Sequence, residues 1–269
     1  MNADKVPDTK LKGIKLIVAD LDGTLLHDDK SLDRNIKSVL KEKNIPLTFV
    51  SGRNVHIIQE YLDELNITLP YITNNGANMF LGNTCIYECP IHLNELEICL
   101  SILVKREVAF LAYSNQVIYS VGYQDGLDAF KNRLIGKCEI VEDAKITDIL
   151  KDSIFKVVMI HPKMENVKDH LNSVCDKTIC IQSEGSIYTL TNKDATKGKT
   201  LKKLLEYLNV KPSSVLAFGD NYNDISMFEV VDGVAVENAQ MSLKVVAKNF
   251  TKSNEDDGVS YFIQNKLEL

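Results

Sequence analysis

An apolar run that ends in two aspartates constrains the fold of this chain more than any other feature. Residues 14–19, IKLIVA, are followed at once by the pentapeptide DLDGT at 20–24. The run predicts a strand buried in a parallel sheet, so Asp20 and Asp22 would stand at its carboxyl end, where open α/β sheets bind ligands. On an extended segment both side chains point the same way, and at ~4 Å two such charges repel by about 4 kcal/mol at an effective dielectric near 20. A cation, a proton or a catalytic role must account for them, although an acidic turn leaving a strand remains the alternative for this motif alone.

The composition excludes several classes of protein. The chain has 269 residues, 45% of them hydrophobic and 25% charged, which is typical of folded domains and sufficient for one or two of them. A net charge of -6 gives no general attraction to nucleic acid or to an anionic membrane. Residues 1–5 show no apolar signal region, and no stretch approaches the ~18 uninterrupted apolar residues of a membrane span. Six cysteines without metal-ligand spacing predict reduced thiols, and we expect a cytoplasmic protein with neither nucleic-acid nor membrane partners.

The order of helix and strand patterns predicts two domains. Over the first eighty residues, strand patterns at 14–19, 46–50 and 71–73 alternate with helix patterns at 32–43 and 55–65. Such alternation predicts a parallel sheet covered by helices. Ser31 and Ser51 are placed to cap the two helices, and Asn44 to end the first.

The rhythm changes in the middle of the chain. Residues 82–185 contain strand-rich patches between helices, with a hairpin expected where 108–113 and 116–120 pair, and the first pattern then resumes. We therefore predict an α/β core domain formed by residues 1–81 and 186–269. An α+β domain at 82–185 is inserted into it.

Two further turns are suited to an anion. Ser51 and Gly52 follow an apolar strand at a predicted helix start, where backbone N–H groups and the helix dipole favour a phosphate. An ordinary helix cap is the alternative for Ser51. Lys197 and Lys199 open a predicted helix, where a cation opposes the dipole, which indicates that one of them binds an anion. Residues 198–200, GKT, do not end a P-loop, because Lys193 stands where that motif needs a glycine.

A last turn adds oxygen ligands. The apolar strand pattern at 215–218 is followed by Gly219 and then by Asp220, Asn223 and Asp224. Together with Asp20 and Asp22 this turn gives four carboxylates and no histidine or cysteine, a set that suits Mg²⁺ better than zinc. Acidic turns also occur as helix caps, which is the alternative for this turn alone.

Taken together, these turns resemble the four motifs of the haloacid dehalogenase superfamily. DLDGTLL at 20–26 is similar to the first motif, Ser51 with Gly52 to the second, Lys197 with Gly198 to the third and GDNYND at 219–224 to the fourth. The insertion lies between the second and third motifs, as in the Cof-type (class IIB) branch. The stretches NNGA at 74–77, VENA at 236–239 and EDDGV at 255–259 are also similar to that branch. Ser51 stands where threonine is more usual there, with the hydroxyl retained.

The resemblance implies a Rossmann-like three-layer core, an inserted cap and a phosphoryl-transfer site. Asp20 would attack phosphorus, and Asp22 would act as general acid and base. Mg²⁺ would be held by the carboxylate of Asp20, the backbone carbonyl of Asp22 and Asp220, with Asp224 orienting its waters. Groups for the phosphoryl oxygens would come from Leu21, Ser51, Gly52, Lys197 and Asn223.

We therefore expect a Mg²⁺-dependent phosphatase, monomeric or weakly dimeric, that acts on a small-molecule phosphate ester, with a sugar phosphate as the favoured substrate. A phosphomutase or phosphotransferase is the alternative within the same chemistry. A regulatory module phosphorylated on aspartate is less favoured, because Asp22 would shorten the life of the phosphoaspartate. Arg53, His27 and Asn75 lie near the motifs in sequence and are interpreted as surface or hinge residues. No residue of the insertion is singled out.

Overall fold

The chain forms two compact units. The computed structural model describes residues 11–132, 134–161 and 164–268, so residues 1–10 of the predicted core domain lie outside the described part. The core unit comprises Met1–Arg53, Glu60–Ile86 and Thr196–Leu269, and the inserted unit comprises Asn54–Gln59 and Tyr87–Ala195.

The bounds of the inserted unit differ from the predicted 82–185 at both ends. The unit extends to Ala195 because strand β12 (Ile187–Asn192) pairs antiparallel with β10 and β11. It begins at Tyr87, within strand β6 (Thr84–Glu88). It also takes in Asn54–Gln59, where Ile57 packs against an apolar cluster of the unit.

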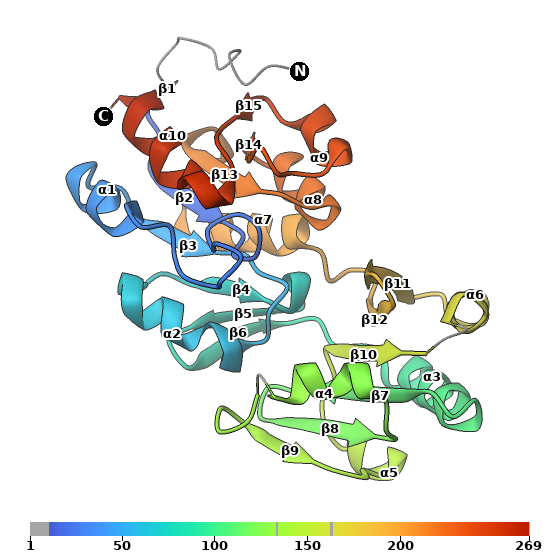
Figure 1. The fold of residues 1–269 in the computed structure, drawn as a ribbon. Coiled ribbons are helices and arrows are strands. Elements are labelled where there is room, and N and C mark those ends of the chain that lie inside the picture. Colours follow the sequence, from blue (N-terminus) through green and yellow to red (C-terminus); the bar gives the residue numbers. More distant parts are fainter. Residues whose placement is uncertain (1–10, 133, 162–163, 269) are drawn as a thin grey trace. The chain divides into compact units, whose positions relative to one another are not determined.

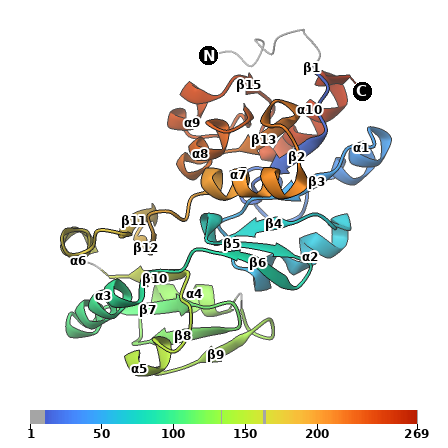
Figure 2. The ribbon, with the colours of Figure 1, turned by 180° about the vertical axis from the view of Figure 1, so that it is seen from behind.

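A five-stranded parallel sheet organises the core unit, in the order β15-β14-β13-β2-β3. All four residues of β2 are buried, as expected for a strand with helices on both faces. Helix α10 lies in front of the sheet in Figure 1 and helix α7 in front of it in Figure 2, so the two helices cover opposite faces. The strands are β2 (Leu16–Ala19), β3 (Leu47–Phe49), β13 (Val215–Gly219), β14 (Asp232–Ala235) and β15 (Asn249–Phe250).

Helices and short strands complete the core unit. The helices are α1 (Ile36–Glu42), α2 (Val55–Leu65), α7 (Lys197–Leu208), α8 (Ile225–Phe228), α9 (Met241–Val246) and α10 (Gly258–Lys266), of which α2 begins in the inserted unit. A three-stranded sheet contains β4 (Tyr71–Thr73), β5 (Asn78–Leu81) and β6, and β1 (Leu11–Lys12) pairs with β16 (Leu267–Glu268). Single turns of 3₁₀ helix are η1 (Asn74–Gly76), η2 (Pro212–Ser214), η3 (Tyr222–Asp224) and η4 (Asn254–Asp256).

The inserted unit is built on a six-stranded sheet in the order β11-β12-β10-β7-β8-β9, antiparallel except for the β8–β9 pair. Two apolar clusters draw on alternate residues of its strands, Phe110 belonging to one and Leu111 to the other. The further strands are β7 (Ala109–Tyr113), β8 (Val117–Val121), β9 (Glu139–Val141), β10 (Lys156–Ile160) and β11 (Thr178–Glu184). The helices are α3 (Leu93–Lys105), α4 (Asp125–Asn132), α5 (Ile146–Ile149) and α6 (Met164–Val174).

Most predicted elements are confirmed, including α2, β4 and the β7–β8 hairpin, but both predicted serine caps are wrong. Helix α1 begins at Ile36, because the Ser31 hydroxyl lies in the preceding turn and donates to Asp29. At α2 the capping side chain is Asn54, whose Oδ1 accepts the His56 amide at 2.9 Å. None of the helices in the described part of the chain has the length and apolar character that crossing a membrane requires.

Candidate active site

Three carboxylates converge at the carboxyl edge of the parallel sheet. Asp20 follows β2 and Asp220 follows its neighbour β13, and the Asp20 amide donates to the carbonyl of Phe218 at 3.0 Å. Asp224 comes from η3, one turn after Asp220. Each of Asp20, Asp220 and Asp224 has a carboxylate oxygen within 4.8 Å of the other two. The predicted juxtaposition of the first and fourth motifs is therefore present in the structure.

Glycine is required where this cluster closes. Gly23 has φ +70°, and a Cβ on it would lie 2.5 Å from Oδ2 of Asp220. A Cβ at this distance would clash with the Asp220 carboxylate, and residues other than glycine rarely adopt a φ of this sign. Gly23 thus allows the loop after β2 to pass directly against Asp220.

Lys197 is buried among these acids. Its side chain is fully buried, and its Nζ lies 2.8 Å from Oδ1 of Asp20 and 2.6 Å from Oδ1 of Asp224. Burial alone would lower the pKa of Lys197, but the charges of Asp20 and Asp224 outweigh it and raise that pKa. Lys197 is therefore a fixed cation within the carboxylate cluster. It stands at the first residue of α7, as the sequence predicts.

The carboxylate of Asp224 is fully engaged by the protein. Its Oδ1 accepts from Lys197, and its Oδ2 accepts the amides of Asp220 and Asn221, both at 3.0 Å. With Asn221 it forms a capping box at η3. The capping interpretation of this turn is therefore confirmed, and the site interpretation stays a prediction. A carboxylate with these partners is better suited to fix its neighbours than to bind a metal directly.

Burial and crowding perturb the other two acids. Burial, opposed by Lys197 and reinforced by Asp224 and Asp220, raises the pKa of Asp20 to about 8. Burial and the charge of Asp224 raise the pKa of Asp220 to about 7. Both shifts disfavour the ionised carboxylates, because burial and the neighbouring negative charges outweigh the attraction of Lys197. A divalent cation would relieve that strain.

Asp22 stands apart from the cluster. Arg53 donates to its carboxylate from Nε at 2.6 Å and from Nη2 at 2.7 Å, and Lys30 donates from Nζ at 3.1 Å. Although burial would raise the pKa of Asp22, the hydrogen bonds and charges of Arg53 and Lys30 lower it to about 2. The Arg53 guanidinium lies over the ring of Tyr61, 5.2 Å from its centroid, which fixes the fork that holds Asp22.

A second group of residues joins the second and fourth motifs. The side-chain Nδ2 of Asn223 donates to Oδ1 of Asn75 at 2.9 Å, and the backbone amide of Asn75 donates to the carbonyl of Ser51 at 3.0 Å. A Cβ on Gly52 would lie 2.8 Å from that same Asn75 oxygen. The Oδ1 of Asn223 is buried without a hydrogen-bond partner among the described residues. Asn75 therefore connects the predicted phosphate-binding residues Ser51, Gly52 and Asn223.

The donor set fits Mg²⁺. Asp20 and Asp220 offer hard carboxylate oxygens within reach of a common point, and burial together with the charge of Asp224 raises the pKa of both, a cost that a bound cation would offset. The described residues place no histidine or cysteine in this cluster. Asp22 could take part through its backbone carbonyl only, since its carboxylate is bound by Arg53.

A family model for haloacid dehalogenase-like hydrolases matches residues 17–263, which is most of the chain. The chain belongs to the haloacid dehalogenase-like hydrolases. The predicted family, the Cof-type branch, the α/β fold with an inserted cap and the prediction of a phosphatase enzyme are confirmed.

Individual relatives of this hydrolase cover most of its length. The candidate phosphatase YxeH of Bacillus subtilis is 28% identical over 93% of the chain and 97% of its own length. YwtE of the same organism, a 5-amino-6-(5-phospho-D-ribitylamino)uracil phosphatase, is 27% identical over 94% of the chain and 98% of its own length. A crystal structure of a haloacid dehalogenase-like hydrolase from Bacteroides thetaiotaomicron is 26% identical, with a TM-score of 0.83 over 93% of this chain and 98% of that one.

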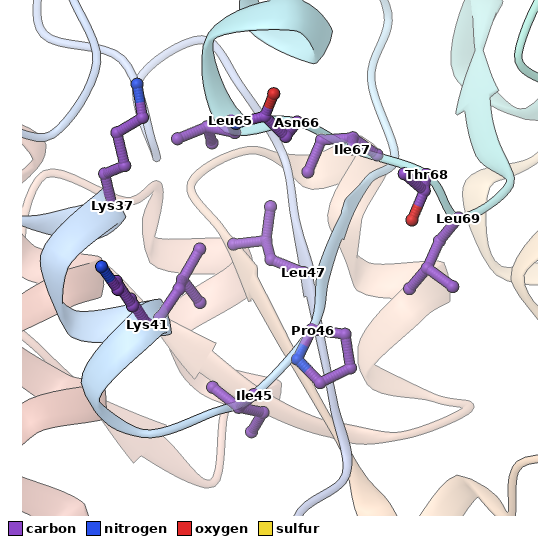
Figure 3. Close-up of a pocket in the computed structure, with 11 residues that line it drawn as sticks. Lys37, Lys41, Ile45, Pro46, Leu47, Leu65, Asn66, Ile67, Thr68 and Leu69 are labelled. Carbon is purple, nitrogen blue, oxygen red and sulfur yellow. The ribbon is translucent and has the colours of Figure 1, made fainter.

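A separate hollow of about 370 Å³ lies elsewhere in the hydrolase. Figure 3 shows Pro46 and Leu47 at the start of β3, Ile67 and Leu69 from the loop after α2, and the helix α1 residue Lys37 around it. These residues stand at the amino end of β3, whereas Ser51 follows the carboxyl end. Ligands of open α/β sheets bind at the carboxyl ends of strands, so we assign the chemistry to the carboxylate cluster and not to this hollow.

Two residues of this hydrolase, Arg53 and Asn75, contact predicted site residues, which the sequence did not indicate. The sequence predicts surface or hinge roles for Arg53 and Asn75, but Arg53 donates two hydrogen bonds to Asp22 and Asn75 accepts one from Asn223. The signal for Asn75 is its place in NNGA, since Asn74 and Asn75 both have positive φ, an unusual backbone for two successive residues. Arg53 gives no signal beyond its position two residues after Ser51.

Proposed function

We propose that this chain is a Mg²⁺-dependent phosphatase that hydrolyses the phosphate ester of a small polyhydroxylated metabolite through an aspartyl phosphate. The observation that carries the proposal is the buried contact of Lys197 with Asp20 and Asp224, beside Asp220. A protein that only needed stability would gain little from burying such charges. The cluster also lies at the sheet edge where ligands of this architecture bind.

Asp20 is the proposed nucleophile. Its carboxylate oxygen forms a bond to phosphorus while the bond from phosphorus to the ester oxygen breaks, which gives an aspartyl phosphate and a free alcohol. Water then attacks the same phosphorus, which releases inorganic phosphate and restores Asp20. Splitting a slow hydrolysis in this way lowers the barrier of each step.

Asp22 is the proposed general acid and base. It gives a proton to the departing ester oxygen and later takes one from the attacking water. In the resting structure Arg53 and Lys30 bind its carboxylate. The phosphoryl group of the substrate has to draw these cations away before Asp22 can carry a proton.

The remaining residues bind charge. Lys197, the Ser51 hydroxyl, the Asn223 side chain and backbone groups of Leu21 and Gly52 are proposed to hold the phosphoryl oxygens. When bound, Mg²⁺ would supply the positive charge that offsets repulsion between a carboxylate nucleophile and a phosphate dianion. We propose that Asp20, Asp220 and the Asp22 carbonyl hold the ion and that Asp224 orients its waters.

The substrate class follows from chemistry and from one relative. YwtE is named for a substrate whose phosphate is carried by a ribityl chain. A sugar or polyol phosphate presents the same primary phosphate ester with neighbouring hydroxyl groups. We assign selection among such esters to the inserted unit and expect the chain to act as a monomer or weak dimer in the cytoplasm.

A panel of phosphorylated metabolites tests this function. Purified protein is incubated with each ester in the presence of Mg²⁺ or EDTA, and free phosphate is measured. Phosphate release that requires Mg²⁺ and favours sugar or polyol phosphates supports the proposal. An isomerised ester without free phosphate would indicate a phosphomutase, and a stable phosphoprotein with negligible turnover would indicate a regulatory module.

A further inference from the structure

The loop that carries Asp22 is compact and is held from outside. It runs from β2 to α1, over residues 20–35, and contains both Asp22 and its partner Lys30. Isolated bridges join Asp22 to Leu26 and Leu26 to Leu32, which fold the loop back on itself. Its conformation determines where the Asp22 carboxylate stands.

A segment more than two hundred residues later binds this loop. Glu255, the first residue of the EDDGV stretch, accepts the amide of Asp28 on its Oε1 at 2.6 Å. Asn254, the residue before that stretch, donates from its side chain to the carbonyl of Leu26 at 3.0 Å. The amide of Ser260 donates to the buried Asp33 carboxylate at 2.9 Å. The loop is thus fastened at several points along its length.

Asp257 has the most contacts of these residues. Its carboxylate lies 2.9 Å from Nε2 of His27, accepts the Arg34 amide at 2.9 Å and accepts the Asn35 side chain at 3.2 Å. A carboxylate can only accept, so His27 donates from Nε2. The His27 ring is 3% exposed, and its Nδ1 lies 2.9 Å from the Ser31 hydroxyl. His27 therefore connects Asp257 to the turn that carries Lys30.

We propose that Asp257 and His27 are positioning residues that hold the 20–35 loop so that Asp22 can reach the leaving oxygen of the substrate. This inference rests on the proposed function of Asp22 as general acid. A displacement of about 1 Å can cost about 10²-fold in rate when it separates reacting groups. The buried contact between His27 and Asp257 fixes the middle of the loop, five residues from Asp22.

The dependence of rate on the leaving group distinguishes positioning of Asp22 from a merely structural role. An alkyl ester, such as the best sugar phosphate of the panel, needs its departing oxygen protonated, whereas the nitrophenolate of p-nitrophenyl phosphate leaves unaided. The constant kcat/KM reports only the steps up to release of the alcohol, so later hydrolysis of the aspartyl phosphate does not mask the difference.

The Asp257→Asn variant should lose about tenfold or more in kcat/KM for the alkyl ester and less than about threefold for p-nitrophenyl phosphate. Asparagine tolerates the left-handed backbone of residue 257, where φ is +54°, so the change removes charge without backbone strain. His27→Gln, which keeps one donor, is the second variant if Asp257→Asn melts below the assay temperature. It should show the same direction with a smaller loss.

Asp256→Asn is the matched control, because the Asp256 carboxylate accepts from Ser253 within its own turn. It should leave the ratio of the two kcat/KM values unchanged, and Asp22→Asn should change that ratio more than Asp257→Asn does. Equal losses on both esters, or no loss, in the folded Asp257→Asn or His27→Gln protein would overturn the inference. If the wild-type protein hydrolyses neither ester with Mg²⁺, it is the proposed function that fails.

Discussion

The two units of the chain bury sheets of similar size but different kinds of side chain. In the core unit the buried residues include ionisable ones: Asp20, His27, Asp33, Lys197 and Asp224. In the described part of the inserted unit, the buried polar side chains are Ser, Thr and Asn only. Both units therefore have an apolar core, and among the described residues the fully buried acids and the fully buried lysine lie in the core unit. The partly exposed Lys156 of β10 is a desolvated charge in the inserted unit, where burial lowers its pKa to about 8.

Burying a charge costs stability unless a partner compensates for it. The inserted unit buries mainly apolar side chains, and its sheet residues alternate between two apolar clusters. The core unit also buries ionisable side chains in two places, the carboxylate cluster around Lys197 and the loop contacts around His27. We assign the chemistry to the first place and the positioning of Asp22 to the second, so substitutions in the two units should have separable effects.

After loss of the nucleophile Asp20, the largest effect is expected when Asp22 loses its role in proton transfer. Asp22→Asn should lower kcat for an alkyl phosphate by about 10²–10⁴-fold, the range that general acid–base groups contribute. The Asp22 carboxylate lies outside the Asp20–Asp220–Asp224 cluster, so Mg²⁺ should still bind. Steady-state kinetics and calorimetric Mg²⁺ titration measure the two quantities. Full activity in this variant would remove Asp22 from the mechanism.

Removing the buried cation should cost somewhat less activity. Lys197→Met takes away one donor to the phosphoryl oxygens and should lower kcat by about 10²–10³-fold. It also leaves Asp20 and Asp224 without their shared cation, so the metal-free protein should lose about 3–5 kcal/mol of stability. Lys199→Met, at an exposed position two residues along the same helix, is the control and should behave as wild type in kinetics and chemical denaturation.

A cavity in the inserted unit should affect stability and leave the metal site intact. Leu100, on α3, is fully buried in the larger apolar cluster, so Leu100→Ala should cost about 2–5 kcal/mol of unfolding free energy. The exposed Leu93 of the same helix provides the control, since Leu93→Ala should change stability by less than about 0.5 kcal/mol. If Leu100→Ala also weakens Mg²⁺ binding in a calorimetric titration, the effects of substitutions in the two units are not separable.

The smallest effect concerns pH. The pKa values of Asp20 and Asp220, about 8 and about 7, are raised in the folded state, so the folded metal-free chain binds more protons than the unfolded chain. Its stability therefore falls as pH rises through the window from roughly 4 to 8. Mg²⁺ competes with those protons, and the rise in Tm at saturating Mg²⁺ should be about 2–4 °C greater near pH 8 than near pH 6. Equal rises at both pH values would contradict the charge deficit inferred for the cluster.

Much of the site could be predicted because its residues are close in sequence to strand ends. Asp20, Ser51 and Asp220 each follow an apolar strand, and a parallel sheet brings such positions to one edge. The start of α7 is set by a local cap and not by an apolar pattern. Residues 193–200 have no apolar periodicity, and the helix is set by Thr196, whose side chain accepts the Lys199 amide.

The contacts that the sequence does not reveal are tertiary ones between distant segments. Arg53 binds Asp22 and His27 binds Asp257, pairs separated by 31 and 230 residues. No local period or turn signal encodes such a pair. The extent of the inserted unit depends in the same way on pairing, since β12 belongs to it through β10 and β11.

The nucleophile assigned to Asp20 is tested most directly by comparing phosphate release from wild-type protein and from Asp20→Asn, with Mg²⁺ and the best ester of the panel, beside the melting temperatures of both. Asparagine keeps the shape of the side chain but cannot form the aspartyl phosphate. We predict a loss of about 10⁴-fold or more with no fall in melting temperature. Retention of activity within about tenfold of wild type would contradict the assignment of the buried carboxylate at the end of β2 as the group that attacks phosphorus.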